Sequence, residues 1–429
     1  MEFKPTHYSL ENVATGRQFP DTGWLLEDPE GGKPSLIRAH YALPQLTVRS
    51  EAWGLYQFCD WLPAGRMLRG SSAPVTWKSE ALAKELGLQN LYITFSGYWP
   101  ARGAGMTTCS FKETEAYSVC GRLQPDTKQV LVVASAGNTA RAFAKVCSEN
   151  RIPLLLSVPE DNLDALWFEE PLNGCVKLIA PQSGGDYFDA IHLSNMALQS
   201  PRFIAEGGAK NIARRDGMAT TVLSAVMAIG HIPDYYFQAV GSGTGAIAAW
   251  EANLRLLADG RFGTNKMRLI VSQNTPFLPM YEAWQAGSRE LLPYQDDLAR
   301  RHCEEIDAKV LSNRKPPYSI AGGLFDALQE SGGDILKATN AEARAAGALF
   351  EGLEGIDIHP AAQVATASLI NYTRAGKLDP EATVMLNITG GGEALFKEAK
   401  TLWYLKPAQV FGLEPAADEV VAAVEGFFN

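Results

Sequence analysis

QVLVVASAGNTARAFAKVC, residues 129–147, is the stretch of sequence that decides the fold. It begins with a run of apolar residues, passes through a short turn of small residues at SAGNT (135–139) and continues as a helix pattern. A strand that is apolar on both faces and leads into a helix is typical of a parallel sheet covered on both sides. The stretch therefore predicts a strand–turn–helix unit of an α/β protein.

The same alternation of strands and helices continues on both sides of this unit. We expect strands at 90–95, 152–159, 175–181, 234–240, 267–272 and 383–392, and helices at 79–88, 185–199, 217–230, 241–260, 340–355 and 361–376. Two separate runs predict two doubly wound domains, and ligands in such sheets bind beyond the carboxyl ends of the strands. We assign residues 71–112 and 210–429 to a large domain and residues 113–209 to a small mobile domain. Residues 1–70, rich in turn residues, are expected to form an extension packed on the large domain.

Bulk composition limits the class of protein and of partner. The 48 acidic residues outnumber the 38 Lys and Arg, and the resulting net charge of -10 argues against a nucleic-acid-binding protein. Small anionic substrates remain possible. The six cysteines are scattered without a C-x-x-C pair, which favours free thiols in a reducing compartment. Neither a signal-peptide core nor an apolar run of the ~18 residues that a membrane helix needs is present, so we expect a cytoplasmic protein.

The loop GSGTG (241–245) predicts a phosphate site. It follows a strand and opens a helix, where free backbone N–H groups bind phosphate and glycine permits close approach. With Ala246 it also satisfies the dinucleotide fingerprint, but the next strand ends in Ser272-Gln273-Asn274 with no acidic residue to hold a ribose. We therefore favour a lone phosphate over a dinucleotide. A tight turn that binds nothing is the alternative.

TTCSFKETEA (107–116) places a lysine where its charge is disfavoured. Ser110 and Glu113 have the spacing of a capping box, so we expect a helix whose first turn contains Lys112. The positive end of the helix dipole, and any burial, lower the pKa of an ammonium there. A neutral amine can form a Schiff base with a carbonyl cofactor. Together with a phosphate loop and a loop at 135–139 suited to a carboxylate, this lysine fits pyridoxal phosphate and an amino acid.

The remaining polar clusters are less specific. GGAKNIARRDGMAT (207–220) carries three cations, Lys210, Arg214 and Arg215, and is either a solvated basic turn or an anion site. His359 precedes a proline, and the other histidines are isolated, so we expect no metal site. The cysteine-free segment 8–29 cannot bind zinc through thiolates.

Four motifs in order resemble the fold-type II pyridoxal-phosphate enzymes, which include threonine synthase, cysteine synthase and tryptophan synthase β. They are SFKE (110–113), SAGNT, GSGTG and TGGG (389–392), and the resemblance runs from about residue 70 to 400. It implies two doubly wound domains with the cofactor in the cleft between them. NIARRDGMAT (211–220) is similar to a threonine synthase motif, and the stretches NLYITFSGYWP (90–100) and TCSFKETEA (108–116) look most like the cysteate synthases of that family.

The resemblance also implies roles for individual residues. Lys112 would carry the cofactor as a Schiff base and shuttle the α-proton, Asn138 would hydrogen-bond the ring hydroxyl, and Thr389 would face the pyridine nitrogen. The cofactor phosphate would be held by Gly241, Ser242, Gly243, Thr244 and Gly245. The substrate α-carboxylate would be bound by Ser135, Ala136, Gly137 and Thr139.

The implied reaction is a β-replacement in which sulfite displaces phosphate from O-phosphoserine to give cysteate, as in coenzyme M biosynthesis. Both the leaving group and the nucleophile are anions, which suggests substrate-binding roles for Lys210, Arg214 and Arg215, and less strongly for Arg102. The alternatives are a threonine synthase that acts on O-phosphohomoserine, a cysteine synthase that uses sulfide, and an NAD(P)-dependent oxidoreductase. The resemblance further suggests a homodimer with no membrane or nucleic-acid partner.

Overall fold

Two parallel sheets organise the chain in this computed structural model, which describes residues 3–135 and 137–429. The larger sheet has the strand order β15-β14-β13-β16-β5-β4, and every pairing is parallel except that of β4 with β5. Its strands are β4 (Val75–Lys78), β5 (Asn90–Phe95), β13 (Tyr235–Ala239), β14 (Arg268–Asn274), β15 (Asp334–Ala338) and β16 (Thr383–Ile388). All six residues of β16 are buried, which explains its uninterrupted apolar run.

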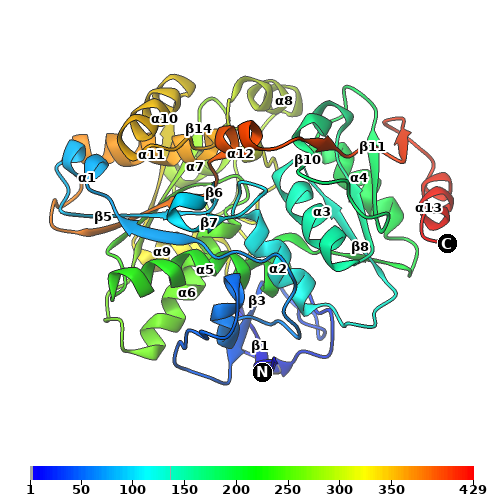
Figure 1. Cartoon of the computed structure of the whole chain (residues 1–429), viewed down its shortest axis with the longest axis horizontal. Helices are drawn as coiled ribbons and strands as arrows, with labels where there is room; N and C mark the ends of the chain where they lie inside the picture. The colour runs from blue at the N-terminus through cyan, green and yellow to red at the C-terminus, as the bar shows by residue number, and fades with distance from the viewer. Residues whose placement is uncertain (1–2, 136) are drawn as a thin grey trace.

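Helices cover both faces of this six-stranded sheet (Figure 1). One face packs against α1 (Ala81–Leu86), α10 (Asn340–Glu354) and α11 (Pro360–Arg374). The other packs against α5 (Ile212–Ile229), α6 (Thr244–Asp259), α7 (Pro279–Gln285) and α9 (Leu324–Ser331). The sheet is therefore doubly wound, as the alternating pattern predicts.

The second sheet has five parallel strands in the order β12-β8-β9-β11-β18. These are β8 (Val130–Ala134), β9 (Leu154–Ser157), β11 (Val176–Pro181), β12 (Phe203–Ala205) and β18 (Gln409–Phe411). Helices α2 (Lys112–Arg122) and α3 (Asn138–Asn150) cover one face, and α4 (Tyr187–Ala197) and α13 (Ala417–Gly426) cover the other.

The C-terminal end of the chain differs from our assignment of residues 210–429 to the large domain. Strand β18 extends the five-stranded sheet by pairing with β11, and α13 packs beside α4. Figure 1 shows this red segment crossing from α12 (Glu393–Ala399) to the side of the molecule that holds α4. The short strand β18 thereby covers β11 and becomes the edge of this sheet.

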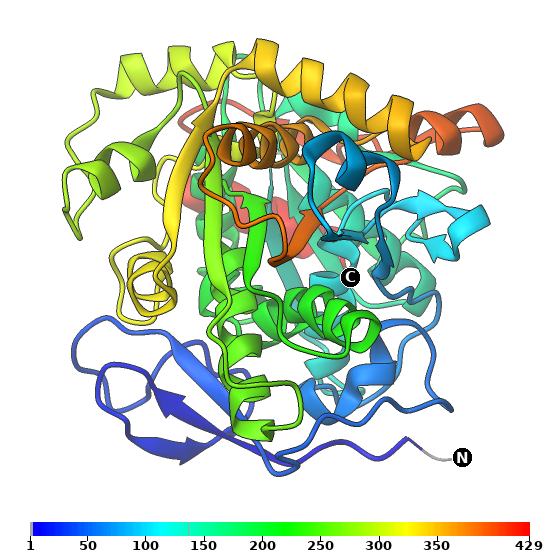
Figure 2. The ribbon, with the colours of Figure 1, turned by 90° about the vertical axis from the view of Figure 1, so that its left-hand side faces the viewer.

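The N-terminal extension forms an antiparallel sheet of β1 (Tyr8–Asn12), β2 (Gln18–Pro20) and β3 (Ile37–Tyr41). Its apolar side chains pack on Ile212 at the start of α5. Figure 2 shows this blue sheet lying against the green helices, away from α10 and α11. The N-terminal sheet therefore contacts α5, in the part of the chain that we assign to the large domain.

The remaining elements are short strands, 3₁₀ turns and one surface helix. They are β6 (Tyr98–Trp99), β7 (Ala104–Gly105), β10 (Trp167–Phe168), β17 (Trp403–Tyr404), α8 (Asp296–Glu305) and the 3₁₀ segments Gly54–Trp61, Pro100–Arg102, Glu160–Ala165, Gly208–Lys210 and Lys309–Leu311. Within the described ranges, no helix combines the length and the apolar character needed to cross a membrane.

Candidate active site

The glycine loop 241–245 forms a cradle between β13 and α6. The backbone N–H groups of Ser242, Gly243 and Gly245 make no hydrogen bond to the described part of the chain. A Cβ at Gly241 would lie 2.8 Å from the Val310 carbonyl oxygen, and Gly243 has φ +78°. The loop thus requires glycine and presents unpaired donors at the positive end of a 16-residue helix, which fits a phosphate group.

This cradle forms one wall of a cavity, which we call the inner cavity. Lys112, the first residue of α2, also lines this cavity. The inner cavity brings together all residues that the resemblance assigned to the cofactor: Lys112, Asn138, Gly241, Ser242, Gly243, Thr244, Gly245 and Thr389. His359 and Gln238, to which the sequence analysis gave no role, also line it. Its wall therefore combines an amine, a carboxamide, a hydroxyl and a phosphate cradle.

The capping box expected at Ser110 and Glu113 is wrong. The N-cap is Phe111, and the Glu113 carboxylate accepts a hydrogen bond of 2.6 Å from the backbone N–H of Thr108. The Ser110 hydroxyl accepts from the N–H of Lys112 at 3.3 Å. The Glu113 carboxylate therefore accepts from a backbone N–H of the loop before the helix, and not from the N-cap residue. Lys112 still occupies the first turn.

Burial lowers the pKa of the Lys112 ammonium below its ordinary value, and the cation of Arg214 adds to this effect. Glu115, one turn along the same helix, opposes the shift because its Oε2 lies 3.2 Å from Lys112 Nζ. The lowered pKa agrees with the expectation for a lysine at this position. Desolvation is its main cause.

Arg214 joins Lys112 in a buried network of two cations and two carboxylates. Its Nε and Nη2 donate to the two oxygens of Glu206 at 2.8 and 2.7 Å, and Nη2 lies 3.5 Å from Glu115 Oε1. Burial opposes the charge of Arg214, but the two carboxylates raise its pKa overall. Its Nη1 makes no hydrogen bond with the described residues and remains available to a ligand.

The SAGNT loop lines the continuation of the cleft beside Lys112. Ser135, Gly137, Asn138 and Thr139 share this part of the cleft with Arg214, Tyr187, Ser242, Val310, Ser312 and Asn313. Gly137 adopts φ +148° and its N–H donates to the Ser135 hydroxyl at 3.0 Å. Among the described residues, the N–H groups of Asn138 and Thr139 have no acceptor, so they can bind a carboxylate. Ala136 lies outside the described residues.

The TGGG segment closes the cavity beside the Lys112 loop. The N–H of Phe111 donates to the Thr389 carbonyl at 3.0 Å, and Ser110 forms a β-bridge with Gly390. A Cβ at Gly390 would lie 2.3 Å from His359 Nδ1. The Thr389 side chain is almost buried and faces the cavity.

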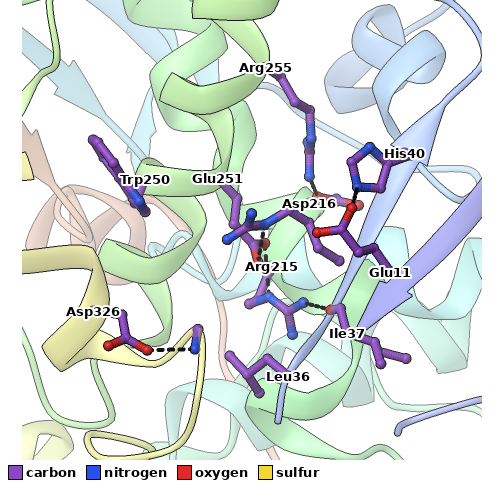
Figure 3. Close-up of polar contacts among 12 residues, drawn as sticks. Glu11, Leu36, Ile37, His40, Arg215, Asp216, Trp250, Glu251, Arg255 and Asp326 are labelled. Atoms are coloured by element: carbon purple, nitrogen blue, oxygen red, sulfur yellow. Dashed lines mark hydrogen bonds and ion pairs between the residues drawn. The ribbon is translucent and has the colours of Figure 1, made fainter. Parts of the chain in front are cut away.

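The cations at 210–215 do not all face the cleft, because they lie on different sides of α5 and the turn before it. The prediction of an anion site at Arg215 is wrong: its buried guanidinium donates to Glu251 Oε2 at 2.9 Å and to the Ile37 carbonyl (Figure 3). It also donates to the Ala209 carbonyl. It joins α5 to α6 and to the N-terminal sheet. Lys210 forms a surface ion pair of 2.8 Å with Glu27 and lines an outer hollow that also contains Arg214.

Arg102 is also held elsewhere. Its guanidinium stacks on the rings of Trp77 and Trp99, at 4.7 and 5.0 Å from their centroids. The stacking gives this cation a structural role.

Two polar contacts of the motif residues were not identified from the sequence. Glu115 contacts Lys112, and Arg141 Nη2 donates to Asn138 Oδ1 at 3.1 Å. Each partner follows its motif residue by three positions on one helix, a spacing that brings side chains together. That spacing is the sequence feature from which both contacts could have been anticipated.

Comparison with known proteins identifies the family. The family described as "Pyridoxal-phosphate dependent enzyme" matches residues 74–390. Cysteate synthase of Methanosarcina barkeri is 48% identical over 94% of this chain and 96% of its own length. Cysteate synthase of Methanoculleus marisnigri is 45% identical over 98% of this chain and 97% of its own length.

Solved structures share the fold at low sequence identity. Maize serine racemase has a TM-score of 0.57 at 12% identity and covers 76% of this chain and 91% of its own. Threonine deaminase isoform 2 from Solanum lycopersicum has a TM-score of 0.54 at 17% identity and covers 76% of this chain and 87% of its own. The expected fold-type II architecture is confirmed. The chain belongs to the pyridoxal-phosphate-dependent enzyme family.

Proposed function

We propose that this enzyme is a cysteate synthase, which converts O-phospho-L-serine and sulfite into L-cysteate and phosphate. The observation that carries the proposal is the near full-length similarity to cysteate synthases, at 44–48% identity. The cleft supports it, because it combines the half-buried amine of Lys112, a phosphate cradle and an arginine with one available donor.

The inner cavity fits pyridoxal phosphate. Loop 241–245 would hold the phosphate, Asn138 and Thr389 would contact the ring, and Lys112 would hold the aldehyde carbon. When bound, the cofactor supplies an electron-withdrawing ring that acidifies the α C–H bond of an attached amino acid. Thr389 would offer the ring nitrogen a neutral hydroxyl, which would suit elimination and replacement at Cβ.

The residues of the chain would bind the amino acid and move its proton. The unpaired N–H groups of Asn138 and Thr139 would hold the α-carboxylate, with the Ser135 hydroxyl beside them. Lys112 Nζ, whose pKa is lowered by burial, would accept the α-proton. Glu115, 3.2 Å away, would then stabilise the resulting ammonium.

Arg214 is the proposed contact for the anionic leaving group or for sulfite. Glu206 holds its Nε and Nη2, so the guanidinium plane is fixed and Nη1 would bind the anion. Lys210, at the rim of the outer hollow, would attract anions to the cleft without a fixed contact. Arg215 has no part in this proposal.

The test is to supply the purified holoenzyme with O-phosphoserine, with and without sulfite, and to measure released phosphate and the amino-acid product. We expect cysteate only when both substrates are present, and none from Lys112→Ala. Conversion of O-phosphohomoserine to threonine, or of phosphoserine and sulfide to cysteine, without cysteate formation would refute the proposal and identify the alternative enzyme.

We also infer several properties from the resemblance: a cytoplasmic homodimer, a place in coenzyme M-type sulfonate biosynthesis, and closure of a mobile small domain over the substrate. All six cysteines are free thiols, which supports a reducing compartment. Gel filtration with light scattering would test the dimer.

A further inference from the structure

Arg141 links three motifs around the cofactor cavity from a position behind its wall. It lies one turn after Asn138 on α3, and only 2% of it is exposed. Its Nε and Nη2 donate to the carbonyl of Thr108, in the loop before Lys112, at 3.3 and 3.0 Å. Its Nη1 donates to the Ala165 carbonyl at 2.7 Å. Nη2 also lies 3.7 Å from Glu393, which directly follows the TGGG motif.

The contact with Asn138 fixes the orientation of a carboxamide. Arg141 Nη2 lies 3.1 Å from Asn138 Oδ1. A guanidinium has only donors, so the atom that faces it must be the amide oxygen. A flipped amide would place two donors against each other and lose the hydrogen bond. The Asn138 NH₂ group, which can only donate, is therefore left for the cavity that Asn138 lines together with Lys112.

We propose that Arg141 is a positioning residue that locks Asn138 as a hydrogen-bond donor toward the ring oxygen of the cofactor and so favours the ionised form of that oxygen. This inference rests on the placement of Asn138 in the proposed function. An ionised ring oxygen accepts a stronger hydrogen bond from the Asn138 N–H than a neutral hydroxyl oxygen does, so a donor fixed at this position favours the ionised form. The lock therefore selects the state of the cofactor in which its ring oxygen carries the negative charge.

The surroundings explain why arginine suits this position. The planar guanidinium of Arg141 donates to two backbone carbonyls and to the Asn138 amide oxygen at once, which the single ammonium of a lysine cannot do. The guanidinium also lies 4.1 Å from the centroid of the Trp167 ring, and the nearby Glu393 compensates its buried charge. Arg141 is thus held from several sides, and Asn138 can rotate only by losing its hydrogen bond to this fixed guanidinium.

The test is the absorbance spectrum and the cofactor affinity of the holoenzyme without substrate. The form with an ionised ring oxygen gives the long-wavelength yellow band, and the form with a ring hydroxyl absorbs in the near ultraviolet. We expect Arg141→Met and Asn138→Ala each to move absorbance from the yellow band to the ultraviolet band and to weaken cofactor binding on the order of 10-fold. The double variant should show no further change, because both substitutions remove one interaction.

Two variants keep the test decisive. Arg141→Lys retains the charge, guards against a failure of Arg141→Met to fold, and should show the same spectral change to a smaller extent. Arg215→Lys is the matched control, since Arg215 is equally buried and binds a carboxylate and two carbonyls away from the cavity. It should lower thermal stability and leave the spectrum unchanged.

The outcomes separate the two claims. If Asn138→Ala changes the spectrum while both Arg141 variants match the wild type, the positioning role of Arg141 is refuted and the proposed site stands. If Asn138→Ala itself leaves the spectrum and the cofactor affinity unchanged, the proposed placement of Asn138 fails, and the inference fails with it. A spectral change in Arg215→Lys equal to that of Arg141→Lys would also refute the positioning role of Arg141, because a general loss of protein stability would then explain both changes.

Discussion

Replacing Glu115 by glutamine should lower the pKa of the Lys112 amine. Glu115 is completely buried, and its carboxylate is the nearest opposite charge to Lys112 Nζ, at 3.2 Å. An opposite charge within about 4–6 Å shifts a pKa by about 1–3 units. Removing this charge leaves desolvation and the Arg214 cation, which both disfavour the ammonium, against the smaller opposing effect of the Glu206 carboxylate. We therefore expect the midpoint for Lys112 to fall by about one to three pH units.

The assay follows recombination of the apoenzyme with pyridoxal phosphate. Only the neutral amine attacks the aldehyde, so the recombination rate rises as pH passes through the pKa of Lys112. In Glu115→Gln this rise should occur at lower pH, and recombination at acidic pH should be faster than in the wild type. Rapid-mixing absorbance measurements across a pH series give the midpoint directly.

Glu113→Gln is the matched control. Glu113 is buried on the same helix, but its carboxylate accepts from the Thr108 N–H, a contact that the glutamine carbonyl oxygen can preserve. In Glu113→Gln the midpoint for Lys112 should stay close to that of the wild type. An unchanged or higher midpoint in Glu115→Gln would refute the reasoning that this carboxylate stabilises the ammonium.

Three further predictions concern the cradle and the two arginines. Gly241→Ala places a Cβ 2.8 Å from the Val310 carbonyl oxygen and should weaken cofactor binding on the order of 10-fold or more in a spectroscopic titration. Gly174→Ala, where the added Cβ meets open space, should leave cofactor affinity unchanged, and equal affinities of the two variants would contradict the proposed phosphate cradle. Arg215→Met leaves Glu251 buried without this partner and should lower the free energy of unfolding in urea by about 3–5 kcal/mol, with the KM for phosphoserine unchanged. An altered KM at normal stability would show that Arg215 does take part in substrate binding. Arg214→Lys keeps the charge but loses the fork and should raise the KM for phosphoserine by about 10-fold, and an unchanged KM would remove it from substrate binding.

Much of the site could be predicted because its motifs lie at the ends of parallel strands. Such strands end at one edge of a sheet, so loops that are distant in sequence, such as 241–245 and 389–392, are brought together once the sheet forms. The sequence alone also placed Lys112 in the first turn of a helix. The direction of its pKa shift followed from that position, although burial proved to be the main cause.

Side-chain direction could not be predicted in the same way. Arg214 and Arg215 are adjacent, yet one lines the cleft and the other joins α5 to the N-terminal sheet. Successive residues point about 100° apart on a helix, and the rotation of α5 about its axis depends on its packing. The expected capping box failed for a related reason, since Glu113 took a donor in the loop instead of its own N-cap.

The sequence by itself determined the α/β class, the order of strands and helices, and the small-residue loops of the cofactor cavity, because periodicity and glycine content are local properties. Only the tertiary structure decided which charges meet. The pairing of Glu115 with Arg214, and the return of β18 to the five-stranded sheet, join residues far apart in the chain. These contacts depend on how the helices and sheets pack, which no local pattern specifies.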